Sequence, residues 1–152
     1  MQTFQTVTDV LDNAQNFHRY AESLYSDLQQ NIDNERERML LNYMAIHEHD
    51  MGSKLQLISD NASSKVLGTW MQFTVEQSPQ IFFENLQKNL GRSIDDIASM
   101  GQDADSYLQH VFQDARDTAP TQDIKELFDQ LAAMETLEKQ ALSKATNSVW
   151  DV

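Results

Sequence analysis

The sequence predicts an all-α protein, an antiparallel four-helix bundle, and three observations lead to this class. Four stretches place apolar residues at alternating three- and four-residue steps, which is typical of helices with one buried face. Short connections join the first stretch to the second and the third to the fourth, as in antiparallel hairpins. The connection between the pairs, 60–92, is too long for a simple loop and suits a crossover that carries a short helix. With 152 residues, 40% of them hydrophobic, the chain is expected to form a single domain over 1–152.

The first two helices are predicted at 8–31 and 33–59. Thr8 is the expected N-cap of the first, and Glu35 and Glu37 suit the positive end of the second. The first apolar stripe comprises Val10, Ala14, Phe17, Ala21, Leu24 and Leu28. The second comprises Leu41, Met44, Glu48, Met51, Leu55 and Ile58. Both helices are long enough for a bundle.

The crossover and the last two helices carry clear boundary signals. Ser78 followed by Pro79 predicts the start of the short crossover helix, which Gly91 ends. Ser93 with Asp96 resembles a capping box and opens a helix at 93–117, and Thr121 or Thr118 caps a helix at 121–147. The third stripe comprises Ile94, Ile97, Gly101, Ala104, Leu108, Val111 and Ala115. The fourth comprises Ile124, Leu127, Leu131, Met134 or Glu135, Glu138, Leu142 and Ala145.

Composition limits the partners and the chemistry. The 24 acidic and 11 basic residues give a net charge of −13, which argues against nucleic acid and anionic membranes as main partners and leaves a cationic ligand or partner open. Without cysteine, disulfides and thiolate metal sites are excluded, so any metal would be held by carboxylate and imidazole. The chain shows neither a signal-peptide pattern nor an apolar run of 18 residues, which favours a cytoplasmic location.

Ionisable residues interrupt the apolar stripes at one level of the predicted bundle. They are His18 in the first helix, Glu48 in the second, and Glu135 and Glu138 in the fourth, whereas the third offers only Gly101. Such groups on an inward face are costly unless they are paired, protonated or bound to metal. Their coincidence marks a candidate site.

The same residues carry a family resemblance. The runs His18–Tyr25, Leu41–Leu55 and Leu131–Glu138 resemble helices of rubrerythrin-like members of the ferritin-like superfamily. The resemblance implies a ferritin-like bundle in which six ligands on four helices hold two metal ions. The corresponding positions here are His18, Glu48, Met51, Gly101, Glu135 and Glu138.

Only Glu48 and Glu135 match the ligands that the resemblance implies, so normal di-iron oxidase chemistry is not expected. Slipping the third helix could turn Asp103 or Asp105 inward, but both fall off its predicted stripe. Two interpretations stay open for His18, Glu48, Glu135 and Glu138. The preferred one is a buried ionic cluster without a cofactor, in which His18 is an imidazolium; the alternative is a site for one iron, manganese or zinc ion.

The sequence thus favours a non-catalytic binding, structural or regulatory protein over an enzyme. The alternative is a mononuclear metal-binding protein with a role in redox chemistry or metal storage. No hydrolase, nucleotide-binding or zinc-protease motif is present, and His47 and His49 are expected on solvated helix faces. A homodimer, an unidentified protein partner and a small-molecule ligand all stay open.

Overall fold

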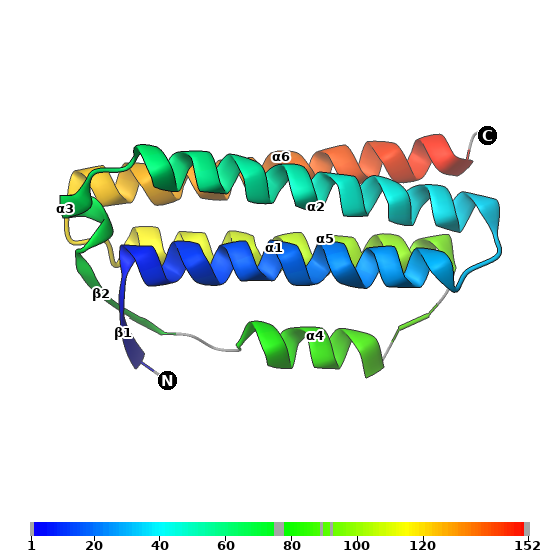
Figure 1. The fold of residues 1–152 in the computed structure, drawn as a ribbon, viewed down its shortest axis with the longest axis horizontal. Coiled ribbons are helices and arrows are strands. Elements are labelled where there is room, and N and C mark those ends of the chain that lie inside the picture. Colours follow the sequence, from blue (N-terminus) through cyan, green and yellow to red (C-terminus); the bar gives the residue numbers. More distant parts are fainter. Residues whose placement is uncertain (1, 75–77, 89, 92, 151–152) are drawn as a thin grey trace.

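A computed structural model describes residues 2–74, 78–88, 90–91 and 93–150. The described chain is mostly helical, which confirms the all-α class in outline (Figure 1). In order, its elements are β1 (Gln2–Thr6), α1 (Val7–Gln30), α2 (Glu35–Asn61), α3 (Ser64–Leu67), β2 (Trp70–Thr74), α4 (Pro79–Lys88), α5 (Ile94–Asp117) and α6 (Gln122–Trp150). The four long helices end within three residues of their predicted bounds. Of the predicted crossover, 75–77, 89 and 92 lie outside the described residues.

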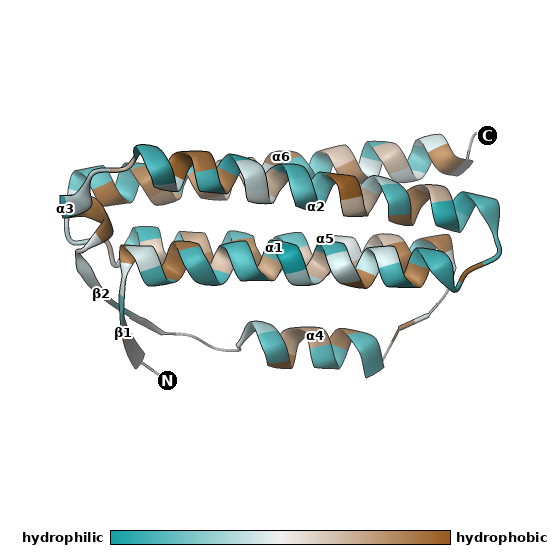
Figure 2. Ribbon diagram, in the orientation of Figure 1, coloured by the Kyte–Doolittle hydropathy of each residue, from teal (hydrophilic) through white to brown (hydrophobic). Residues whose placement is uncertain are grey.

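The four long helices, α1, α2, α5 and α6, lie side by side (Figure 1). The main contacts are within the two hairpins, α1 with α2 and α5 with α6, and α2 also contacts both α5 and α6. Each long helix mixes apolar and polar residues along its length (Figure 2), and apolar residues from all four helices form the buried core. Among the described residues, no helix has the length and apolar character needed to span a membrane.

Side-chain caps fix where the long helices begin. The capping box of Ser93 and Asp96 is confirmed, and Thr121 rather than Thr118 accepts a hydrogen bond from the Ile124 amide. The expected Thr8 cap is wrong, because Thr6 caps α1 in a capping box with Asp9. The Thr8 hydroxyl instead donates to the Leu67 carbonyl oxygen and links α1 to α3.

A two-stranded antiparallel sheet, which the sequence reasoning missed, flanks one end of the long helices. Strand β1 runs directly into α1, and β2 belongs to the crossover, with Thr6 opposite Trp70. Met71 is buried, whereas the neighbouring Trp70 side chain is exposed. This alternation is the signal of a half-buried strand, but five residues are too few for it to stand out in a helical sequence.

The short crossover helix α4 was predicted from Ser78 and Pro79, and it covers α1 and α5 (Figure 1). Phe83 of α4 is buried against Phe17 of α1, with ring centroids 4.7 Å apart. The ring centroids of Phe82 and Tyr107 of α5 are also 4.7 Å apart. Aromatic packing therefore fixes the crossover on this side of the molecule.

Candidate functional site

The centre of the site is His18 of α1, whose imidazole lies between two carboxylates from other helices. Nδ1 is 2.6 Å from Glu48 Oε2 of α2, and Nε2 is 3.3 Å from Glu135 Oε1 of α6. The exposed fractions are 3% for His18, 7% for Glu48 and 1% for Glu135. Three of the four predicted site residues therefore meet in the core.

The geometry favours a protonated histidine. A neutral imidazole has one N–H donor, whereas both ring nitrogens of His18 face carboxylate oxygens. Burial alone would lower the pKa of His18, but the contacts with Glu135 and Glu48 outweigh it and raise the pKa to about 10. The raised pKa favours the imidazolium form at neutral pH.

Glu135 is the less well satisfied of the two carboxylates. Its 3.3 Å ion pair with His18 does not have hydrogen-bond geometry, and neither oxygen has a hydrogen-bond partner among the described residues. Burial raises the pKa of Glu135 above 4.5, although the charge of His18 opposes the rise. The His18–Glu48 contact is therefore the stronger half of the centre.

Glu138, the fourth predicted residue, belongs to a separate pair. Its carboxylate oxygens lie 3.1 and 3.3 Å from Nδ1 of His47, and the ring of Tyr43 lies 4.0 Å from that imidazole. His47 was expected on a solvated face, but it is only 32% exposed at the side chain. The sequence could not show that α6 brings a carboxylate beside it.

Asp105 was placed off the predicted stripe of α5, and the structure overturns this expectation. Its exposed fraction is 7%, and burial together with the charges of Glu48, Glu135 and Glu138 raises its pKa to about 9. A signal was present in the sequence, because Gly101, Asp105, Leu108 and Phe112 also follow four- and three-residue steps and all are buried. The buried face of α5 is therefore wider than one stripe.

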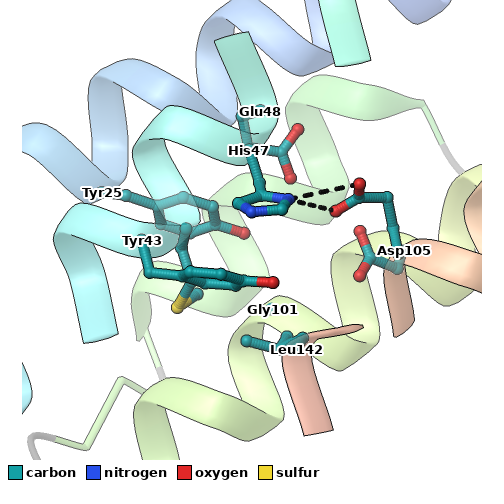
Figure 3. A pocket seen from close by; sticks show the side chains of 9 residues that line it. Tyr25, Tyr43, His47, Glu48, Gly101, Asp105 and Leu142 are labelled. Carbon is teal, nitrogen blue, oxygen red and sulfur yellow. Dashed lines mark hydrogen bonds and ion pairs between the residues drawn. The ribbon is translucent and has the colours of Figure 1, made fainter. Parts of the chain in front are cut away.

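A small pocket, drawn in Figure 3, adjoins the His18 centre through Glu48, which is part of its lining. It is lined by Tyr25, Tyr43, Met44, His47, Glu48, Gly101, Asp105, Glu138 and Leu142, and its volume of about 10 Å³ has room for one water-sized body. Figure 3 shows the oxygens of Tyr25, Tyr43 and Asp105 turned toward a common space between the helices. The Tyr25 hydroxyl is buried and has no hydrogen-bond partner among the described residues.

Gly101, at the level where the resemblance implies a carboxylate, lets neighbouring side chains approach the backbone of α5. A Cβ atom there would lie 2.6 Å from Leu142 Cδ2 and 2.8 Å from Met44 Cε. Apolar side chains therefore occupy the space next to this position. The acidic group of α5 is instead supplied one turn later, by Asp105.

A wider groove of about 360 Å³ also reaches the His18–Glu48 pair. It lies between α1 and α2 and is lined by Gln15, His18, Arg19, Glu22, Glu48, His49, Gly52, Ser53 and Gln56. Most of the residues that line it have polar side chains, and the groove gives solvent a route to the buried centre.

The structure does not bring the four residues of the candidate metal site together at one point. Across the described residues, no group of three or more histidine, aspartate and glutamate side chains is arranged to hold a metal ion. His18, Glu48 and Glu135 are joined to one another as ion pairs, and Glu138 is engaged by His47. Met51, where the resemblance implies a histidine, is buried in the core.

Searches against protein-family models, curated proteins and solved structures find no match to this chain. The family relationship therefore continues to rest on the sequence pattern.

Proposed function

We propose that this chain is a ferritin-like bundle, related to rubrerythrins, that has lost di-iron oxidase chemistry and serves a non-catalytic structural or binding role. The observation that carries the proposal is the His18 imidazole between Glu48 and Glu135. In this interpretation a proton on His18 supplies the positive charge that metal ions supply in the family.

Competition between a proton and a metal ion supports this assignment. A metal ion binds a ring nitrogen through its lone pair, so it requires the neutral imidazole. Both nitrogens of His18 face carboxylates, and the pKa of about 10 keeps them protonated at neutral pH. Met51 and Gly101 remove two more of the implied ligands, because a thioether is a poor ligand for a hard cation and glycine offers none.

The ionic centre suits a structural role because it joins three helices. Removing one member of a buried ion pair leaves a desolvated charge, so any sliding of α1, α2 or α6 that separates the partners is penalised. The centre would thereby fix the relative positions of these helices. A binding role would use the polar groove or the pocket on either side of it.

Metal analysis of protein purified from its natural source tests the proposal. We expect far less than one equivalent of iron, manganese or zinc per chain, before and after incubation with each metal. The double variant His18→Glu, Met51→His, which restores two implied ligands, is a positive control and should take up more iron. Two tightly bound irons in the unmodified chain would rule the proposal out.

A mononuclear metal protein is the second candidate, favoured by the meeting of His18, Glu48 and Glu135 at one point. It requires His18 to lose a proton and Glu138 to leave His47. Under this alternative, one equivalent of zinc, manganese or iron binds and Glu48→Gln abolishes uptake. Unchanged uptake by Glu48→Gln would eliminate this ligand set.

A further inference from the structure

The small pocket beside the His18 centre contains a buried hydroxyl that lacks a partner. Tyr25 is 1% exposed, its hydroxyl makes no hydrogen bond to the described residues, and it points into the pocket (Figure 3). A buried polar group without a partner costs about 1–3 kcal/mol. Such a group indicates that something able to hydrogen-bond occupies the pocket.

The charges around the pocket favour a cation over a neutral occupant. Glu48, Glu135 and Glu138 bring three carboxylates close to Asp105, and His18 supplies one imidazolium. Burial, together with the negative charge of these carboxylates, raises the pKa of Asp105, so this group also favours its protonated form. A cation in the pocket would reduce the electrostatic repulsion between these carboxylates.

The size and the lining select the kind of cation. The pocket has room for about one water-sized body, and its lining offers phenol and carboxylate oxygens as acceptors. Within the part of the chain that the structure describes, these acidic groups are not placed to hold a metal ion. An ammonium group matches both features, because it is as small as water and carries only donors.

The pocket opens to solvent beside Tyr43, His47 and Glu138, which line it and are partly exposed. This mouth is separate from the α1–α2 groove, since only Glu48 lines both spaces. A cation would therefore enter between α2 and α6, past the His47–Glu138 pair.

We propose that the pocket formed by Tyr25, Glu48, Asp105 and Glu138 binds one small hydrogen-bond-donating cation, namely ammonium or the terminal ammonium group of a primary amine. The ligand donates to the Tyr25 hydroxyl oxygen and to the surrounding carboxylates. The inference does not depend on whether the protein is related to ferritins.

Thermal unfolding of the full chain in ammonium chloride tests this site. At fixed pH and ionic strength we expect Tm to rise with the logarithm of the ammonium concentration above Kd, by about 5–10 °C once the salt reaches one hundred times its Kd. Sodium, potassium and tetramethylammonium chlorides should give no such rise. Equal responses to potassium and ammonium, or to all four salts, would overturn the proposal.

Variants locate the effect. Tyr25→Phe removes only the hydroxyl, so without ammonium its Tm should equal or exceed that of the unmodified chain, and the response to ammonium should weaken at least tenfold in Kd. Asp105→Asn should weaken the response to ammonium as well. Tyr20→Phe, on the same helix but half exposed, is the matched control and should keep the full response. A full response in Tyr25→Phe would exclude the pocket as the site.

A final comparison separates the two sources of the ligand. Methylammonium or butylammonium chloride should match or exceed ammonium if the pocket receives the end of an amine, and should fail if it holds only the free ion. Failure of ammonium and both amines would refute the site without touching the metal-free interpretation of His18.

Discussion

Replacing His18 by leucine should destabilise the protein far more than the loss of an ordinary ion pair. The substitution keeps a side chain of similar size but leaves Glu48 and Glu135 buried without their cation. Breaking a buried pair by removing one partner costs about 3–5 kcal/mol. The rise in the pKa of His18 from 6.5 to about 10 leads to a similar figure, roughly 5 kcal/mol at about 1.4 kcal/mol per pKa unit.

Thermal and urea unfolding, followed by far-ultraviolet circular dichroism, measure this loss. For a chain of this length, 3–5 kcal/mol corresponds to a fall in Tm of roughly 6–20 °C. The loss of stability should be smaller at pH 5 than at pH 7, because at the lower pH the two carboxylates left without a cation are more readily protonated.

The chain offers a matched control in His49→Leu. Nδ1 of His49 is 2.8 Å from Glu22, so the pair has similar geometry, but the side chains are 69% and 31% exposed. Exposed pairs contribute about 0–1 kcal/mol, and His49→Leu should lose no more than that. If His18→Leu and His49→Leu proved equally stable, the buried centre would not have the energetic role argued above.

Three further predictions concern pH, helix packing and the ionic centre. The free energy of unfolding should fall as pH rises from about 6.5 to 10, because the folded-state pKa of His18 is raised and its stabilising contribution is complete only below 6.5. The raised pKa of Asp105, about 9, acts in the same direction from about pH 4 upward. Equilibrium unfolding that showed rising stability across pH 7–10 would contradict both. Gly52→Ala should stabilise α2 by about 0.5–1 kcal/mol, because alanine has the higher helix propensity and the new Cβ would make ordinary contacts, 3.4 Å from Gln15 Oε1 and 3.8 Å from His18 Cβ. A destabilisation above about 1 kcal/mol in urea unfolding would show that the added methyl group clashes with α1. Replacing His18, Glu48 and Glu135 together by leucine should leave stability unchanged or raise it by about 1–4 kcal/mol, because no buried charge is left without a partner. A loss as large as that of His18→Leu alone would instead mean that the ionic centre contributes net stability.

The helices could be predicted because their signals are local. Apolar stripes and caps such as Ser93 and Thr121 act within a few residues, so a single sequence shows them. The short strands β1 and β2 were missed because they are stabilised by pairing with each other across more than sixty residues of chain. Their pattern alone is too short to compete with a helical interpretation.

The ionic centre was predictable in part. Inward positions for His18, Glu48 and Glu135 followed from helical spacing, and the expectation of an imidazolium paired with carboxylate followed from the cost of burying ionisable groups unpaired. The partner of Glu138 and the burial of Asp105 depend on how each helix is rotated about its axis against its neighbours. A periodic stripe defines that rotation only to within about one residue, or roughly 100°. Gly101 and Asp105 share one face of α5, and only the packed structure shows that the glycine leaves the space to Met44 and Leu142.

The protonation state of His18 tests the central claim most directly. Nitrogen-15 NMR of the histidine side chains at pH 8, with His18→Leu to assign the signal, shows whether each ring nitrogen carries a proton. We predict that both nitrogens of His18 are protonated at this pH, with a pKa far above the ordinary 6.5, in protein free of bound metal. A His18 ring nitrogen that is unprotonated at pH 8, or bound to a metal ion, would contradict the account.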